Sequence, residues 1–358
     1  MMAARPLIAR LLAALLAAAA CVGSAGAAGP ERQLAFVAFD RGASRIALAA
    51  IGGVPRPLTP ADGAAHSPAW SPDGRRLVYA ASRNGPWQIY VRDASGGRAR
   101  VLTSGAGDHI FPGWSPGGRR IVYVLRQNGD EQIYVVNADG SGRRRLTGPP
   151  GRSTVPVWSP DGRWIAFVST RDGGVPQLFV MRADGGGVRQ LSRPDTYVGN
   201  AYGRGELTME PTGVLLRPGM LHPAWSPDGR ALAYVTRVGR AEQQIALVNR
   251  DGSNVRRLST GYAPAWSADG RRIAFVVARV GDSQLYVMNT DGTGLRRLTA
   301  SGANMLPAWS PDGRWLAFLT ADERGLSVVV MRPDGSGRRR IGAAAGDLSM
   351  GPSIAWRP

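Results

Sequence analysis

The chain has 358 residues, with 44 basic and 26 acidic side chains, so its formal net charge at pH 7 is +18. Lysine is absent, and every basic residue is arginine. A hydrophobic content of 44% supplies a folded core and excludes a disordered chain. The 48 glycines and 26 prolines recur at fixed places in repeated segments, which excludes a collagen-like or low-complexity sequence.

Residues 1–27 have the pattern of a secretory signal peptide. Arg5 and Arg10 flank an apolar run that is too short to span a bilayer, and small residues follow it. We therefore expect cleavage near Ala27, a mature domain over residues 28–358, and a periplasmic or secreted protein.

The only cysteine, Cys21, lies within this segment. A lipid-modified cysteine is the alternative, but lipoprotein signals prefer leucine three positions earlier, where Ala18 stands. Without other cysteines the mature chain has no disulfide, so its stability has to come from packing.

One segment recurs six times, and its most regular form is PAWSPDGRRLVYA. The recurring tryptophans measure the period, which is 44 residues at first and 41 to 47 later, with one interval of 67. These tryptophans are Trp70, Trp114, Trp158, Trp225, Trp266, Trp309 and Trp356. A period of this length is typical of a β-propeller blade.

One repeat, residues 67–104, shows why the unit is a blade. The turn Ser71–Gly74 is tight, since proline presets φ at its second position and glycine accepts the positive φ that closes it. Short apolar or alternating segments flank this turn and the loops that follow. The four strands that we expect are residues 69–70, 76–80, 88–91 and 100–103.

The incomplete units at the two ends complete each other. Residues 34–59 resemble a blade that lacks its first strand, and residues 352–356 resemble a first strand without the rest. We therefore predict an all-β, seven-bladed propeller of four-stranded antiparallel blades, closed by the C-terminal strand, which removes an exposed sheet edge. Six blades are the alternative.

The W-S-P-D-G turn, the strand ending in I-A-F-V and the segment QLYVMNTDGTGLRRLT (residues 284–299) resemble the TolB-type, WD-repeat-like propellers of bacterial envelopes. The resemblance covers residues 33–357 and implies the propeller fold. It implies less about function, because propellers carry unrelated tasks. The family's namesake has six blades and a separate N-terminal domain, whereas this chain has seven predicted blades.

The expected strand order places the turns on two faces. The repeated S-P-D-G and A-D-G turns share one, here called the regular face, and the variable loops share the other, the irregular face. The irregular face also receives an insertion, residues 193–221, between the fourth and fifth blades. Variable loops on a rigid ring commonly carry binding specificity. The candidate partner-binding residues are Tyr197, Asn200, Tyr202, Arg204, Glu206, Trp87 and His109.

Three histidines, His66, His109 and His222, precede tryptophan strands near the mouth of the ring. Three imidazoles on one axis could hold a metal, as in seven-bladed polysaccharide lyases of related repeat type. Their offsets from the tryptophan differ, so we expect no metal site and no cofactor. A metal-dependent carbohydrate-active enzyme remains the alternative function.

Two other recurring side chains are expected to serve the scaffold. A glutamine starts the third strand in five repeats (Gln88, Gln132, Gln177, Gln244 and Gln284), and an aspartate recurs in the S-P-D-G turns (Asp73, Asp161, Asp228, Asp269 and Asp312). Recurrence in most blades favours scaffold hydrogen bonds over a single site.

Arginine clusters follow both kinds of regular-face turn, as at Arg143–Arg145 and Arg271–Arg272. They predict a basic face, which could attract an anionic membrane or polysaccharide. The alternative is solvated arginine from a biased composition.

Enzyme signatures are absent from the sequence, including the G-x-S-x-G elbow, the Walker loop and paired cysteine ligands. The function that we expect is an exported, non-enzymatic, monomeric scaffold. It would bind an envelope protein or polysaccharide through the irregular face and would not bind nucleic acid.

Overall fold

A computed structural model of the chain describes residues 32–40, 43–60, 62–192, 223–237, 243–279, 282–323, 325–344 and 354–358, together with the short strands 197–198, 208–209 and 215–216. Every regular element within these residues is a β-strand. No helix in the described part of the chain is long and apolar enough to cross a membrane. The predicted signal peptide lies outside the described residues.

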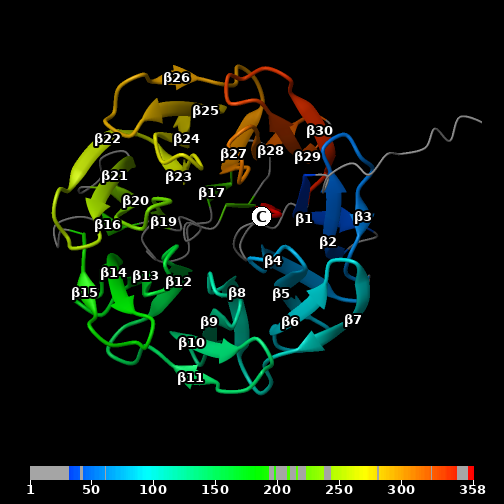
Figure 1. Cartoon of the computed structure of the whole chain (residues 1–358), viewed down its shortest axis with the longest axis vertical. Coiled ribbons are helices and arrows are strands. Elements are labelled where there is room, and N and C mark those ends of the chain that lie inside the picture. Colours follow the sequence, from blue (N-terminus) through cyan, green and yellow to red (C-terminus); the bar gives the residue numbers. More distant parts are fainter. Residues whose placement is uncertain are drawn as a thin grey trace, which may run out of the picture. The chain divides into compact units, whose positions relative to one another are not determined.

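Seven antiparallel sheets are arranged as the blades of a ring within the unit formed by residues 32–358 (Figure 1). The first three blades, each from its innermost to its outermost strand, are β31 (Ile354–Trp356), β1 (Gln33–Asp40), β2 (Ala43–Ala50) and β3 (Arg56–Pro57); β4 (Ala64–Trp70), β5 (Arg76–Ser82), β6 (Gln88–Asp93) and β7 (Gly96–Val101); and β8 (Asp108–Trp114), β9 (Arg120–Gln127), β10 (Asp130–Asn137) and β11 (Arg144–Arg145).

The other four blades follow the same order. They are β12 (Ser153–Trp158), β13 (Trp164–Ser169), β14 (Gln177–Arg182) and β15 (Arg189–Gln190); β19 (Ala224–Trp225), β20 (Ala231–Arg237), β21 (Gln244–Asn249) and β22 (Arg256–Thr260); β23 (Tyr262–Trp266), β24 (Arg272–Arg279), β25 (Asp282–Asn289) and β26 (Arg296–Arg297); and β27 (Ala303–Trp309), β28 (Leu316–Asp322), β29 (Gly325–Met331) and β30 (Arg339–Ala343). The insertion adds β16 (Tyr197–Val198), β17 (Thr208–Met209) and β18 (Leu215–Leu216).

The C-terminal strand closes the ring, as the sequence predicts. β31 pairs antiparallel with β1, so that Leu34 lies opposite Trp356 and Phe36 lies opposite Ile354. The backbone N–H of Arg357 donates to the Gln33 carbonyl at 2.9 Å. The prediction of seven blades is confirmed, and the six-bladed alternative is wrong.

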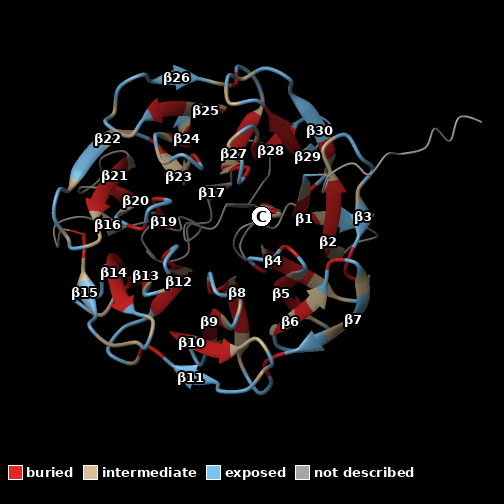
Figure 2. Ribbon diagram, viewed as in Figure 1, coloured by how far each residue is buried: buried red, intermediate tan, exposed pale blue. Residues whose placement is uncertain are grey.

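The core lies between neighbouring blades. Side chains alternate across each strand, so one face of a blade packs on the preceding blade and the other face packs on the next. In β9, for example, Tyr123 packs in a cluster with Val78 of the second blade, whereas Val122 packs in a cluster with Ile165 of the fourth blade. Figure 2 shows the result: the inner and middle strands are largely buried, and the outermost strands are exposed.

The W-S-P-D-G turn is held by its own side chains. In the fourth blade, the Ser159 hydroxyl donates to Asp161 Oδ1 and accepts from the Trp164 backbone N–H at 2.9 Å. Asp161 Oδ1 also accepts from the Arg163 N–H at 3.0 Å, and Gly162 adopts a φ of 68°. The sequence motif therefore encodes a self-contained cap on the innermost hairpin. The same aspartate bonds occur at Asp73, Asp228, Asp269 and Asp312.

Most of the repeated tryptophans tie their blade to the preceding one. In five blades the indole Nε1–H donates to the backbone carbonyl of the residue before the preceding tryptophan, at 2.9 to 3.1 Å. We call this set the Trp ladder; its donors are Trp70, Trp225, Trp266, Trp309 and Trp356, and its acceptors are Ala355, Val157, Ala224, Ala265 and Ala308.

Arginines of the outermost strands tie the blades together at the rim. In the first six blades one arginine of the fourth strand donates to backbone carbonyls in the A-D-G-type turn of the next blade. Charge-assisted hydrogen bonds of this kind are stronger than neutral ones, so they stabilise the rim. We call these side chains the Arg clamps; they are Arg56, Arg100, Arg144, Arg189, Arg256 and Arg296.

Candidate functional site

The innermost strands share a bulge. The residue three positions before the tryptophan has a φ between 47° and 55° in five blades, although none of these residues is glycine. They are Ser67, Phe111, Val155, Ala263 and Leu306. The ladder to the second strand shifts register at the same place in all five. A left-handed conformation is costly for a branched residue such as Val155, and only the surrounding structure maintains it.

The insertion enters the fifth blade at this bulge. Val198 of β16 lies opposite Thr236 of β20, the register position that His109 holds opposite Leu125 in the third blade. The chain rejoins the sheet at β19, where Ala224 pairs with β20. Residues 197–198 are therefore part of the blade, and the extra residues interrupt the innermost strand itself.

The insertion also carries a small hairpin. β17 and β18 pair antiparallel, with Thr208 opposite Leu216 and Met209 opposite Leu215. In the view of Figure 1, β17 lies inside the ring of blades. Of the other candidate binding residues in this segment, the side chain of Tyr197 is not described, and four residues lie outside the described part of the chain: Asn200, Tyr202, Arg204 and Glu206.

Trp87 joins the second and third blades on the irregular face. Its backbone N–H donates to Asp108 Oδ1 at 3.1 Å, and the His109 N–H donates to the Trp87 carbonyl at 2.8 Å. The half-buried Trp87 ring meets the His66 ring edge-on, with 5.3 Å between centroids. Trp87 therefore stands where the innermost strands start, with part of its surface open to a partner.

His109 lies in the core between the blades. Its side chain is fully buried, with its ring centroid 5.5 Å from that of Tyr123. Burial, followed by the positive charge of Arg143, lowers the pKa of His109, while the carbonyls of Trp87 and Gly107 act in the opposite direction. The His109 ring therefore lies in the core between the blades, with its pKa below the ordinary value.

The histidines do not converge on a described metal site. His222 lies outside the described residues, and no group of three metal-binding side chains occurs among the residues that the structure covers. His66 and His109 pack on different rings, those of Trp87 and Tyr123.

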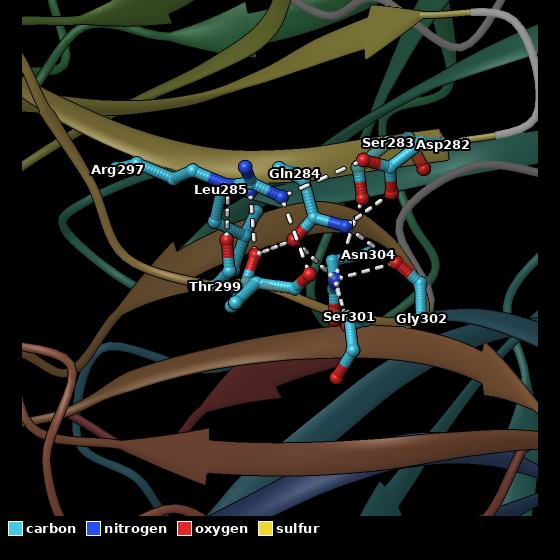
Figure 3. Close-up of polar contacts among 10 residues, drawn as sticks. Asp282, Ser283, Gln284, Leu285, Arg297, Thr299, Ser301, Gly302 and Asn304 are labelled. Atoms are coloured by element: carbon cyan, nitrogen blue, oxygen red, sulfur yellow. Dashed lines mark hydrogen bonds and ion pairs between the residues drawn. The ribbon is translucent and has the colours of Figure 1, made fainter.

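Four of the five third-strand glutamines make scaffold hydrogen bonds, as their recurrence predicts. In the sixth blade, Gln284 Oε1 accepts from the Thr299 hydroxyl at 2.6 Å, and that hydroxyl accepts from the Leu285 N–H at 2.9 Å (Figure 3). Gln284 Nε2 donates to the Gly302 carbonyl at 2.9 Å. The equivalent bond to a hydroxyl at the end of the fourth strand is made by Gln88, Gln132 and Gln177.

Asn304 continues these hydrogen bonds into the seventh blade. Its side-chain amide is fully buried and donates to the carbonyls of Ser301 and Gly302 at 2.9 and 2.8 Å (Figure 3). Asn304 stands at the register position of His109 and Val198. The side chain at this register position is therefore buried in the third and seventh blades. In the fifth blade the extra residues follow directly after it.

The turn aspartates have lowered pKa values for a structural reason. At Asp73, Asp228 and Asp269 the hydrogen bond from the turn serine is the largest cause of the lowered pKa, and a backbone N–H adds to it. Hydrogen bonds to an ionised carboxylate stabilise its charge and so lower the pKa. These carboxylates cap their own turns, as their recurrence predicts.

Several members of the arginine clusters contact other residues of the propeller. The guanidinium of Arg143 lies 5.2 Å from the centroid of the Tyr134 ring, Arg144 is an Arg clamp, and Arg145 Nε donates to the Thr147 carbonyl at 2.6 Å. Attraction of the remaining basic surface to an anionic membrane stays a prediction.

The repeat matches a known sequence family along nearly the whole chain. The pattern of the TolB beta propeller domain fits residues 27–124, 105–216 and 210–357. The chain belongs to the TolB β-propeller family. No curated protein sequence matches this TolB-family propeller.

Solved structures share its fold at low identity. TolB from Acinetobacter baumannii is 20% identical with a TM-score of 0.56, and the match covers 91% of this chain and 67% of that one. An oligogalacturonate lyase in complex with manganese is 18% identical with a TM-score of 0.64, and the match covers 90% of both chains. A puromycin hydrolase is 18% identical with a TM-score of 0.67 over 88% of this chain. The TolB-family propeller spans about half of the hydrolase, 53% of its length.

The place where the insertion joins the blade was not apparent from the sequence. The 67-residue interval between Trp158 and Trp225 locates the excess, but strand pairing decides which of its residues belong to the sheet. The available signal was Pro223, which marks the second half of a bulged first strand, as Pro68 does in the second blade.

Proposed function

We propose that this TolB-family propeller is a non-enzymatic binding scaffold of the bacterial envelope, and that the insertion in the fifth blade is its main contact element. The observation that carries the proposal is the pairing of β16 with β20 (Tyr197 with Arg237 and Val198 with Thr236), because it anchors the insertion in the ring. A segment that is anchored at its base and carries a hairpin presents side chains at a fixed place, which lowers the entropic cost of binding.

Other features support a binding role. The recurring polar side chains, such as Asp161 and Gln284, are engaged in scaffold hydrogen bonds, as is Asn304. The half-buried Trp87 ring supplies a second contact on the irregular face, since aromatic rings are favoured anchors in interfaces. The family relationship and the predicted signal peptide support an exported, envelope location.

The test separates the hairpin from the strand that anchors it. Residues 200–219 are replaced by a short Gly/Ser link, which keeps the Tyr197–Val198 strand in place. We expect a folded ring with nearly unchanged stability, because loop-closure entropy depends weakly on length. Capture of envelope proteins from a cross-linked extract is expected to fall at least about tenfold, which corresponds to about 1.4 kcal/mol.

A matched control replaces the loop 172–175, which also belongs to the irregular face, with a link of equal length. This control should retain the captured proteins. Equal capture by both variants would place the contact elsewhere on the ring, and unfolding of the hairpin variant would make the insertion structural.

A further inference from the structure

Most blade junctions place a large side chain over the repeat tryptophan. The residue six positions after the tryptophan is Arg76, Arg120 or Arg272 in three blades. The guanidinium of each lies over the tryptophan of the next blade, 4.9 to 5.1 Å from its ring centroid. The tryptophans covered in this way are Trp114, Trp158 and Trp309.

At three further junctions a different large side chain packs near the tryptophan. Trp164 and Trp315 occupy the equivalent position in the fourth and seventh blades and pack against the clusters that hold Trp225 and Trp356. At the junction of the first and second blades, Arg357 lies over Trp70 at 5.4 Å.

The junction between the fifth and sixth blades differs at two positions. The residue six positions after Trp225 is Ala231, which is too short to reach the next tryptophan. Thr290 of the sixth blade occupies the position that Arg250 has in the fifth blade. There the Arg250 guanidinium lies 5.4 Å from the ring centroid of Trp164 in the preceding blade. Neither position therefore supplies a long cationic or aromatic side chain. Trp266 is consequently half-buried, whereas the other six repeat tryptophans are buried.

A cavity of about 370 Å³ occupies this place on the regular face. Its walls include Trp266, Ala231 and Thr290, together with the turn carboxylates Asp228 and Asp269. A volume of this size is typical of small-ligand sites. The cavity thus combines an aromatic wall with acidic groups.

Asp269 is the carboxylate that remains available in this cavity. Its Oδ1 accepts from the turn serine and from the Arg271 N–H, and no hydrogen bond or ion pair with another described residue uses Oδ2. The two arginines of the wall have other partners. Arg230 Nε lies 4.0 Å from Asp228 Oδ2, and Arg256 is an Arg clamp that donates to the Thr290 carbonyl.

We infer that this cavity binds an arginine side chain of a partner protein, stacked on Trp266 and paired with Asp269. Four other junctions of the same ring hold a guanidinium over the equivalent tryptophan, so the geometry of the repeat fits this group. A guanidinium stacks on an aromatic face and donates to a carboxylate at the same time, which an ammonium does less well. The site lies on the regular face, so it is independent of the hairpin.

The direct test uses the peptide acetyl-Gly-Arg-Gly-amide and its citrulline counterpart, which has the same shape without the charge. The indole N–H of Trp266, assigned by comparison with Trp266→Phe, is followed by NMR during each titration. The arginine peptide is expected to shift this signal saturably and to bind about five- to tenfold more tightly than the citrulline peptide. Equal binding of both peptides, or no shift, would overturn the inference, as would tighter binding of a methyl galactoside.

Two variants block the cavity from within. Ala231→Arg places the guanidinium of the other junctions over Trp266, and Ala231→Met fills the same space without charge. Both should abolish the arginine-peptide shift while near-ultraviolet circular dichroism stays unchanged, and the Met variant keeps the test valid if the Arg variant misfolds. A shift that persists in both Ala231 variants would place the peptide elsewhere.

Discussion

Single side chains of the W-S-P-D-G turn decide how each blade is capped. A serine hydroxyl such as Ser159 Oγ donates to the carboxylate of Asp161 and accepts from a backbone N–H, so both ends of the turn are tied to one atom. The third blade has Gly117 in place of the aspartate and keeps the bond from the Arg120 N–H to Ser115 Oγ, at 3.0 Å. The serine is therefore the constant part of the cap, and the aspartate is an added stabilising charge.

The aspartate contribution should appear as an acid sensitivity. Because the folded pKa values of Asp73, Asp228 and Asp269 lie below the ordinary value of 3.8, their contribution to stability is fully present above that pH. It is lost as the pH falls through the lowered folded pKa values. A triple Asp→Asn variant keeps an acceptor oxygen at each turn, so its urea midpoint should fall less than that of the parent between pH 5 and pH 2. Parallel pH profiles for the two proteins would contradict this assignment.

At the scale of one element, β31 shows how three residues complete a blade. It pairs with β1, its Trp356 indole donates to the Ala308 carbonyl at 2.9 Å, and the adjoining Arg357 lies over Trp70. The strand therefore connects the first blade to both the seventh and the second. Its loss would leave β1 as an open edge and uncover a tryptophan.

Removal of residues 354–358 is expected to reduce the free energy of unfolding by several kcal/mol, a large part of the total for a domain. The milder Trp356→Phe variant keeps the strand and removes one indole hydrogen bond, so it should cost about 1 kcal/mol. Thermal unfolding followed by circular dichroism measures both. A truncated protein that melts within a degree or two of the parent would show that the strand is dispensable.

At the scale of the whole molecule, residues 32–33 and 357–358 meet as the two halves of a W-S-P-D-G turn. The Arg357 N–H donates to the Gln33 carbonyl at 2.9 Å, just as the Ser71 N–H donates to the Arg76 carbonyl at 2.8 Å in the intact turn of the second blade. Counting from the last repeat tryptophan, a link of Asp-Gly between residues 358 and 32 restores the spacing of the motif.

A circular permutant with this Asp-Gly link, opened between Thr59 and Gly63, should fold to the same ring. New ends in a surface segment are well tolerated when the joined termini lie close together. Near-ultraviolet circular dichroism, dominated by the repeat tryptophans, is expected to match that of the parent protein. A permutant that is soluble but lacks this signal would show that the turn cannot close between Trp356 and Gln33.

The periodicity of Trp70 and its equivalents predicts the blade number and the closing strand, because each repeat encodes its own turns and apolar strands. It also predicts the structural roles of Gln284 and the turn aspartates through recurrence alone. The cavity beside Trp266 was not predicted, since it depends on a side chain that is missing from a cover formed across two blades. Within its own repeat Ala231 shows no unusual feature. Its effect appears only because the fold places it beside Trp266 of the next blade.

The Trp ladder and the Arg clamps bind neighbouring blades at two radii, one near the axis and one at the rim. A blade held at two points, as at Trp266 and Arg256, resists tilting about either one. Four junctions have both kinds of bond and the other three have one of them, so we expect neighbouring blades to keep their relative tilt. The blades then form a rigid frame, so any change of shape on binding is expected in the loops and in the segment that interrupts the fifth blade.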